Sequence, residues 1–106
     1  MFFIHDAQKK IDLGGGVCRR ILAHNPDMMA VEVSFQKGAV GAMHTHPHTQ
    51  ISYVLSGKFS ATLGDETKII SAGDTYITPA DLPHGVTCLE EGTLLDIFTP
   101  ERADFL

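Results

Sequence analysis

Residues 44–63 read HTHPHTQISYVLSGKFSATL, and this stretch determines how the rest of the chain is interpreted. Its second part is rich in Ile, Val, Tyr, Phe and Thr, which favour extended structure, and Ser56-Gly57 divides it as a turn would. Neighbouring side chains of a strand point to opposite faces, so His44 and His46 can point the same way. The stretch therefore predicts short strands, with two imidazoles directed into a barrel.

The remaining sequence has the same character. Short segments rich in Val, Ile, Thr, Phe and Tyr are bounded by Gly, Pro, Asn or Asp, and no window shows a sustained helical period. Only the tail, residues 100–106, is expected to form a short turn of helix. Many short strands at regular spacing indicate an all-β sandwich or barrel, and a jelly roll of two Greek keys fits. The expected strands cover residues 17–24, 28–36, 51–55, 58–63, 67–71, 75–78, 85–89 and 93–99, with turns at 25–27, 56–57, 64–65, 72–74 and 91–92.

Length and composition restrict the possible functions. The chain has 106 residues, which suits a single domain over residues 1–106 and is too short for two. Its formal net charge of −5 argues against a nucleic-acid groove, which needs a basic face. No segment has the length of a membrane-spanning helix, and the N-terminal apolar run is too short for a signal peptide. Cys18 and Cys88 are not a disulfide framework, so we expect a cytoplasmic protein with no nucleic-acid or membrane partner.

Three histidines and one glutamine have the spacing of a metal site. Gln50 has the same parity as His44 and His46, and it could return to their face after the interruption at Pro47. His84 would arrive from a distant strand. Three imidazoles and an amide oxygen suit one first-row divalent ion with open positions, and nickel, zinc, cobalt, manganese and iron are all compatible. Two further histidines, His5 and His24, are expected to be polar surface residues.

The same residues resemble the two motifs of the cupin superfamily. The first motif has a glycine, five residues, His-x-His, three or four residues, Glu, six residues and a glycine. Residues 38–57 follow it, with Gln50 in the glutamate position. The second has a glycine, five residues, Pro-x-Gly, two residues, His, three residues and Asn. Residues 73–88 follow it, with Asp81 in place of the inner glycine and Cys88 in place of the asparagine. The resemblance implies a single-domain cupin, a double-stranded β-helix or jelly-roll barrel.

The amide of Gln50 bears on the chemistry of such a site. A glutamate would donate negative charge and help to stabilise an oxidised, trivalent metal, whereas a neutral amide leaves the ion its full charge. This favours Lewis-acid binding of an anionic substrate over redox cycling. Two roles stay open for His48, namely a hydrogen-bond donor that orients a ligand or a water, and a solvent-facing residue beside Pro47.

One carboxylate lies in an apolar strand. Asp96 shares a face with Leu94 and Phe98, and a buried carboxylate is costly without a partner. In a metal-bearing barrel it is a candidate general acid–base, because burial shifts its pKa towards neutrality. Arg102 is either a solvated charge near the end of the chain or a fork that clamps a carboxylate. The other cationic residues are expected at the surface: Lys9, Lys10, Arg19, Arg20, Lys37, Lys58 and Lys68.

Over nearly its whole length, the chain also resembles one cupin subgroup, the pectin-degradation cupins of the KdgF type. The segments that carry this resemblance are residues 13–17, 46–54, 73–74, 88–92 and 96–106. Members convert 4,5-unsaturated uronate monosaccharides, released from pectin or alginate by lyases, to the linear 4-deoxy-5-keto form. The resemblance implies metal ligation by His44, His46, Gln50 and His84, and a catalytic site lined by Asp96, Phe98 and Arg102. In that site Asp96 would carry protons, Phe98 would form an apolar wall under the sugar, and Arg102 would add a counter-charge.

Three other functions stay open from the sequence. A redox cupin, such as a dioxygenase of small phenols or thiols, would consume oxygen, and Gln50 weighs against it. A sugar-sensing module usually carries a DNA-binding domain, which does not fit in 106 residues. A cupin-type sugar isomerase or epimerase would leave the double bond of an unsaturated substrate intact. We expect an enzyme with a small anionic sugar as substrate. We also expect a homodimer, because the domain is small and Ile51, Tyr53 and Leu55 form an exposed apolar set, but the sequence does not identify the partner surface.

Overall fold

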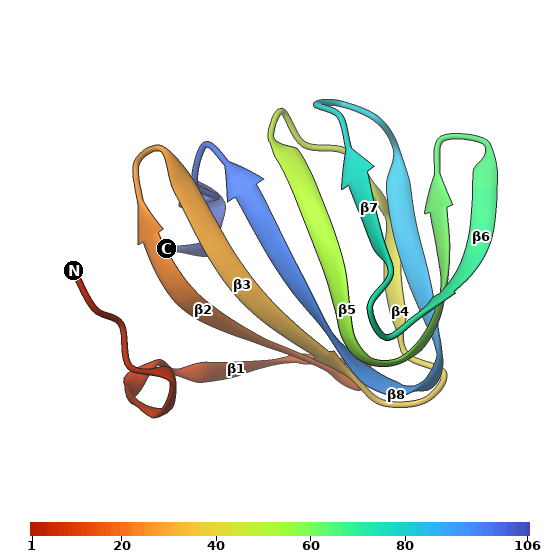
Figure 1. Cartoon of the computed structure of the whole chain (residues 1–106), viewed down its shortest axis with the longest axis horizontal. Helices are drawn as coiled ribbons and strands as arrows, with labels where there is room; N and C mark the ends of the chain where they lie inside the picture. The colour runs from red at the N-terminus through yellow and green to blue at the C-terminus, as the bar shows by residue number, and fades with distance from the viewer.

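The computed structural model describes all residues 1–106, and β-strands dominate its regular structure (Figure 1). Eight strands form one sheet in the order β1-β2-β3-β8-β5-β6, with β4 paired to β8 and β7 paired to β5. No helix is long and apolar enough to cross a membrane. The all-β prediction is confirmed. The strands are β1 (Lys10–Gly14), β2 (Val17–Asn25), β3 (Met28–Phe35), β4 (Val40–His44), β5 (Thr49–Leu63), β6 (Glu66–Ser71), β7 (Thr75–Thr78) and β8 (His84–Thr99).

The longest strands, β5 and β8, run through both halves of the fold. They pair antiparallel from Thr49 opposite Thr99 to Leu63 opposite His84. One half of this pair is extended by β7 on one side and β3 on the other, and the opposite half is extended by β6 and β4. Figure 1 shows how the curved strands leave an interior between the two halves. The pair β5–β8 therefore lines the interior along its whole length.

The predicted turns at residues 56–57 and 91–92 are wrong, because both lie inside long strands. The pairing of β5 and β8 shifts register here. A Cβ atom on Gly57 would lie 2.5 Å from the carbonyl oxygen of Glu91, and one on Gly92 would overlap the carbonyl of Ser56. Glycine in a strand interior marks such a close approach and a bend as readily as it marks a turn. Four expected strands therefore merge into two bent ones.

Two strands were not predicted from the sequence. β1 is mostly exposed and carries two charged residues, and β4 contains small residues and is exposed along most of its length. Neither has the apolar character of a core strand, so their extended form depends on pairing with β2 and β8. The expected turn in the tail is present as a 3-10 turn, η2 (Ala103–Phe105).

Two apolar clusters fill the interior. The larger contains Phe35 and Phe59, whose rings meet edge to face with centroids 5.3 Å apart. Cys88, in the position where the cupin motif has asparagine, is buried in this cluster as a free thiol. The smaller cluster contains Met29, Val31 and Phe98.

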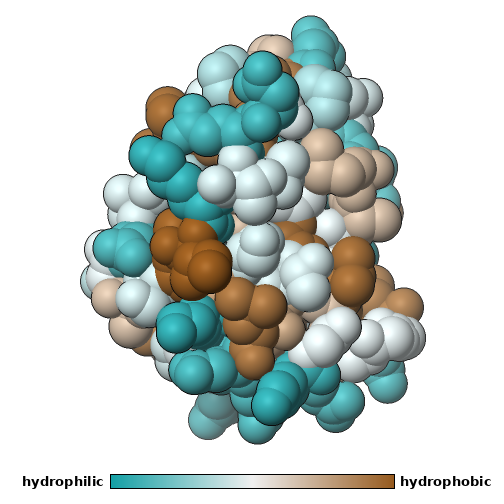
Figure 2. All heavy atoms as spheres, turned by 90° about the vertical axis from the view of Figure 1, so that its right-hand side faces the viewer, coloured by the Kyte–Doolittle hydropathy of each residue, from teal (hydrophilic) through white to brown (hydrophobic).

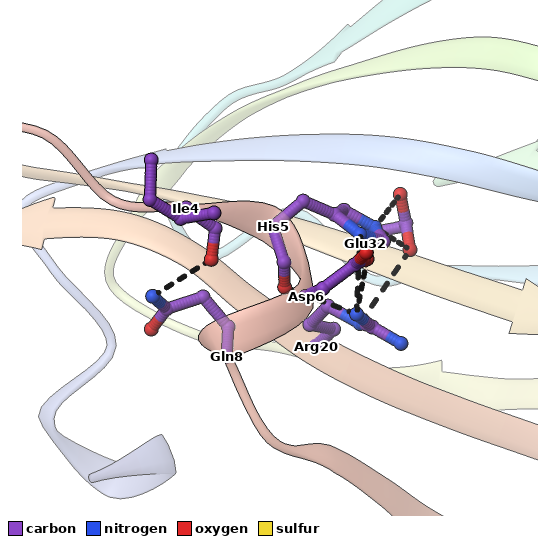
Figure 3. Close-up of polar contacts among 6 residues, drawn as sticks. All are labelled: Ile4, His5, Asp6, Gln8, Arg20 and Glu32. Atoms are coloured by element: carbon purple, nitrogen blue, oxygen red, sulfur yellow. Dashed lines mark hydrogen bonds and ion pairs between the residues drawn. The ribbon is translucent and has the colours of Figure 1, made fainter.

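The N-terminal 3-10 turn, η1 (His5–Ala7), is attached to the sheet by polar contacts (Figure 3). His5 Nδ1 lies 2.7 Å from Asp6 Oδ1, and His5 Nε2 lies 3.2 Å from Glu32 Oε1. Hydrogen bonds to these two carboxylates raise the pKa of His5. Arg20 donates a hydrogen bond to the carbonyl of His5. His5 is exposed, as predicted, and His24 is half-buried and bonded to Glu101.

The outer face of β5 and β7 is apolar and exposed. Ile51, Tyr53 and Leu55 keep 45, 40 and 45% of their surface exposed, and Ile77, the register partner of Ile51, keeps 58%. The predicted exposed apolar set is therefore confirmed, and Ile77 extends it. Figure 2 shows the side of the molecule on which β6 lies, where apolar residues gather in patches between hydrophilic ones.

The close approach of β5 and β8 can be tested at Gly92. We expect Gly92→Ala to lower the free energy of unfolding by about 3 kcal/mol or more, because the added methyl group overlaps backbone rather than a movable side chain. Urea unfolding would measure this. Gly73→Ala is the control, because its Cβ meets open space and only its positive φ is strained, at a cost of about 1 kcal/mol. Equal stability of the two variants would contradict the explanation.

Candidate metal centre and active-site cavity

The three predicted histidines meet at one end of the interior. His44 ends β4, His84 begins β8, and the two are register partners. Their ring centroids are 4.3 Å apart, and that of His46 is 4.6 Å from His84. Potential ligand atoms of the three residues all lie within 4.8 Å of one another. His46 lies beyond the end of β4, so strand alternation is not what brings it beside His44.

Backbone carbonyls orient all three rings. In each histidine, Nδ1 lies 2.8–3.2 Å from the carbonyl oxygen of a residue two positions away. A carbonyl only accepts hydrogen bonds, so in His44 and His84 Nδ1 carries the proton and Nε2 presents a lone pair, whereas His46 faces an acceptor at both nitrogens. Burial lowers the pKa of His46 and of His84, which favours these neutral rings. Nε2 of His84 is buried without a hydrogen-bond partner, as expected of a nitrogen available to a metal.

Gln50 completes the group. Its side chain is 5% exposed, and its Oε1 lies 3.0 Å from Nε2 of His46. A neutral imidazole has one N–H, so His46 can donate either to this oxygen or to the carbonyl of His48, and a cation shared by Nε2 and Oε1 would satisfy the atoms that the single proton cannot. The donor set of three imidazole nitrogens and one amide oxygen thus fits a first-row divalent ion.

A directed chain of hydrogen bonds leads from Gln50 to Asp96. The amide Nε2 of Gln50 donates to Ser52 Oγ at 2.9 Å, and Ser52 donates its hydroxyl proton to Asp96 Oδ1 at 2.6 Å. A glutamate at position 50 would place a second acceptor against Ser52, whose only proton is already given to Asp96. The neutral amide is therefore the side chain that this chain of bonds requires. Ser52 was not predicted as a site residue, although its parity with Gln50 on the expected strand was a usable signal.

Asp96 lies in the interior, as its position in an apolar strand predicted. It is 8% exposed and stands opposite Ser52 in the β5–β8 pairing. Burial raises its pKa to about 6, while the hydrogen bond from Ser52 acts in the opposite direction. Tyr76, the register partner of Ser52 on β7, lines the same space, and burial raises its pKa as well. A carboxyl group with a pKa near 6 can both accept and donate protons at neutral pH.

These groups surround a cavity of about 160 Å³. This is smaller than the roughly 300–1,000 Å³ of sites for drug-sized ligands, so it suits a small molecule. Its lining combines charged and polar side chains with apolar and aromatic ones, among them Arg19, His44, Gln50, His84, Asp96 and Phe98.

Arg102 lies beside Phe98 and Phe105, two aromatic residues of the cavity lining. It is 8% exposed, so the solvated-charge alternative is wrong. Its Nε and Nη2 donate to the two carboxylate oxygens of Asp104 at 3.0 and 2.9 Å. Its guanidinium carbon is 5.1 Å from the ring centroid of Phe98 and 4.2 Å from that of Phe105. The fork that the sequence allowed is therefore present, and it holds a carboxylate of the same chain.

The main chain around residues 46–48 and 79–83 positions His46. The ring of His48 is half-buried with Nε2 3.1 Å from the carbonyl oxygen of Glu101, so the solvent-facing alternative is wrong. The backbone carbonyl of His48, rather than its ring, orients His46. Asp81 donates its backbone N–H to the carbonyl of His46 at 2.8 Å and has φ 66°. This left-handed conformation accounts for the glycine of the cupin motif at this position, and aspartate tolerates it better than most residues.

Arg19 is a site residue that the sequence analysis placed wrongly at the surface. It lies on β2 and lines the cavity together with His44 and Asp96. The signal was available, because Arg19 has the same strand parity as Val17 and Ile21, both of which are apolar. A doubled arginine in a strand places one guanidinium on each face, and only the tertiary structure shows which face encloses the cavity.

Comparisons with known proteins identify relatives along nearly the whole chain. The family model described as the cupin domain matches residues 31–98. The pectin degradation protein KdgF of Dickeya dadantii (strain 3937) is 44% identical over 107 aligned residues, covering 99% of this chain and 97% of that protein. The structure of KdgF from Halomonas sp. matches with a TM-score of 0.95 and 42% identity, covering both chains fully. An RmlC-like cupin from Shewanella frigidimarina NCIMB 400 matches with a TM-score of 0.96 and 39% identity, covering 99% of this chain and 95% of that one.

The metal assignment can be tested at His84. We expect His84→Ala to weaken binding of Ni²⁺ to EDTA-treated, dialysed protein, because a ligand is removed. The loss of affinity should exceed the factor of about 10 to 100 that removal of an outer-shell partner costs. Isothermal titration calorimetry would measure the affinity. His5→Ala is the matched control, because this exposed histidine lies outside the cavity. Unchanged affinity in His84→Ala would remove this residue from the proposed ligand set.

Proposed function

The chain belongs to the cupin family and, within it, to the pectin degradation proteins of the KdgF type, and on this premise we propose how its cavity performs the reaction. The protein is an enzyme that converts 4,5-unsaturated uronates to the linear 4-deoxy-5-keto form. The observation that carries this assignment is the 44% identity to a KdgF protein over 99% of the chain. The roles of individual residues are derived from the contacts described above.

One divalent metal ion is held by His44, His46, Gln50 and His84. The support for this set is the converging lone pairs, the unpartnered Nε2 of His84 and the short distance from His46 to Gln50. When bound, the ion supplies Lewis-acid polarisation of the substrate carboxylate and of the neighbouring ring oxygen. The neutral donor set leaves the ion its full charge, which suits an anionic sugar.

Asp96 moves the proton that the reaction requires. Its carboxylate takes the proton of the hemiacetal hydroxyl at C1, the bond between C1 and the ring oxygen breaks, and an aldehyde forms at C1. The electron pair left on the ring oxygen gives an enolate across C5 and C4. Return of the proton to C4 leaves a ketone at C5 and a methylene group at C4, so no atom is lost or gained. A pKa near 6 suits a group that first accepts and then donates this proton.

Ser52, Phe98 and Arg102 support Asp96 in different ways. Ser52 is fully buried, and its hydrogen bond fixes the orientation of the carboxylate. Phe98 forms an apolar wall of the cavity. Arg102 lies against the ring of Phe98, with its guanidinium carbon 5.1 Å from the ring centroid, and with its partner Asp104 it holds this wall in place. Phe98 and Arg102 thus belong to the catalytic site together with Asp96, and Ser52 positions the carboxylate.

The cavity accepts uronates from alginate as well as from pectin. Once a lyase has introduced the 4,5-double bond, C4 and C5 are no longer stereocentres, and much of the difference between the two sources is lost. Both cysteines are free thiols, which suits an enzyme of the reducing cytoplasm.

The acid–base role can be tested by following the loss of absorbance from the 4,5-double bond. We expect Asp96→Asn to lower kcat by about 10²- to 10⁴-fold, because the amide cannot carry the proton. Asp65→Asn is the matched control, because Asp65 lies in the exposed turn between β5 and β6. Full activity of Asp96→Asn would exclude Asp96 as the proton carrier.

The exposed apolar set of β5 and β7 forms a homodimer interface. Burial of Ile51, Tyr53, Leu55 and Ile77 against a second copy would remove contiguous apolar surface from water. Static light scattering is expected to give twice the chain mass for the wild type and a single chain mass for Ile51→Lys. Ile69→Lys, on β6 outside the set, is expected to remain dimeric. A monomeric wild type would contradict the interface.

A further inference from the structure

We infer that Arg19 binds the carboxylate of the uronate substrate and thereby sets the selectivity of the enzyme for anionic sugars. The inference rests on the proposed function, since it names the group that holds the substrate in the same cavity. Its support comes from the position of Arg19, from its lack of any partner and from the contrast with Arg102.

Strand pairing directs the side chain of Arg19 towards the reacting groups. On the interior face, Arg19 stands opposite Val33 of β3, which in turn stands opposite Leu94 of β8. Asp96 is two residues further along β8 on the same face, and β2, β3 and β8 lie side by side (Figure 1). Two strand spacings separate β2 from β8, which is about 10 Å. A long arginine side chain reaching across Val33 covers much of this distance, and Arg19 does line the cavity.

The guanidinium of Arg19 has no partner within the protein. Its Nε is buried and makes no hydrogen bond, and no carboxylate lies within ion-pair distance. Its guanidinium carbon lies 3.9 Å from the ring centroid of Phe105, so the flat group is stacked and held. Buried polar atoms such as this Nε usually have a hydrogen-bond partner. An unpaired fork with five N–H donors at the wall of a cavity indicates that its acceptor is the ligand.

Arg102 differs from Arg19 in this respect. Both guanidinium groups contact the ring of Phe105, but the fork of Arg102 is occupied by Asp104. Burial and the charge of Arg102 lower the pKa of Arg19, and the charge of Asp104, whose oxygens accept from Arg102, offsets this only in part. A bound anion would offset the effect of burial and the repulsion from Arg102, and would thus stabilise the charged form of Arg19. Of the two cations, Arg19 is therefore the one that is free to bind substrate.

The chemistry of the substrate matches this site. Its carboxylate is conjugated with the 4,5-double bond, so the group is planar, and a guanidinium fork recognises a planar carboxylate through two parallel hydrogen bonds. The rings of Phe98 and Phe105 line the same cavity as flat apolar walls. The carboxylate is retained in the 5-keto product, so Arg19 would hold substrate, transition state and product alike. Such uniform binding lowers KM without changing kcat.

The test compares Arg19→Gln, Arg19→Lys and Lys37→Gln in the double-bond assay. Arg19→Gln is expected to raise KM about 10- to 100-fold, as loss of charge-assisted hydrogen bonds does, with kcat within about twofold of wild type. Arg19→Lys keeps the positive charge but cannot form two parallel hydrogen bonds, so its KM is expected to lie between those of wild type and Arg19→Gln. Lys37→Gln removes the same charge from an exposed position outside the cavity and is expected to leave KM unchanged. Thermal melting of each variant checks that it is folded.

The methyl ester of the same unsaturated uronate makes the test specific for the carboxylate. On the ester, wild type and Arg19→Gln are expected to have equal kcat/KM, because the charge that Arg19 recognises is absent. An unchanged KM for the free acid, or an equal loss with acid and ester, would overturn the inference. Failure of the proposed function would be distinct, because wild type itself would then consume the double bond of neither substrate.

Discussion

The pairing of β5 with β8 is the constraint on which the rest of the molecule depends. In its register, Gln50 stands opposite Phe98, Ser52 opposite Asp96 and Leu63 opposite His84. Side chains alternate between the two faces of a sheet, so a slip by one residue would turn these groups from the interior to the solvent. The contact of Gly57 with Gly92 allows the two backbones to approach and bend where the register shifts. Fold and site are thus specified by the same hydrogen-bonded pair of strands.

Matching of donors and acceptors links the metal centre to the proton carrier. The donors of Gln50 and Ser52 both point towards Asp96, so the amide oxygen of Gln50 is left facing the histidines. The chemistry of the centre and the state of the carboxylate are therefore coupled through one serine hydroxyl. Such a network has a single consistent arrangement of protons, and a glutamate in place of Gln50 would break it. The presence of Gln50, where the cupin motif has glutamate, is thus explained by its hydrogen bond to Ser52.

Charge is distributed unevenly around the cavity. Burial lowers the pKa of His46 and of His84 and so favours their neutral rings. Two arginines stack on the ring of Phe105, and only Arg102 forms an ion pair with a carboxylate. The net charge of the chain is −5, so an anionic sugar must be attracted by these local groups.

The sequence by itself determined the fold class, most strand positions, the metal-ligand candidates and the inward carboxylate, because residue type, alternation and motif spacing are local or nearly local properties. It misplaced the chain around Gly57 and Gly92, since a glycine that permits a turn also permits close strand contact. It also misplaced Arg19, because the two faces of β2 differ only in what the distant strands β3 and β8 place beside them. The tertiary structure alone decided which face encloses the cavity, which arginine keeps its fork free and that Ser52 connects Gln50 to Asp96. The face that encloses the cavity and the contact of Ser52 with Asp96 depend on residues tens of positions apart, and such contacts exist only after the sheet has closed.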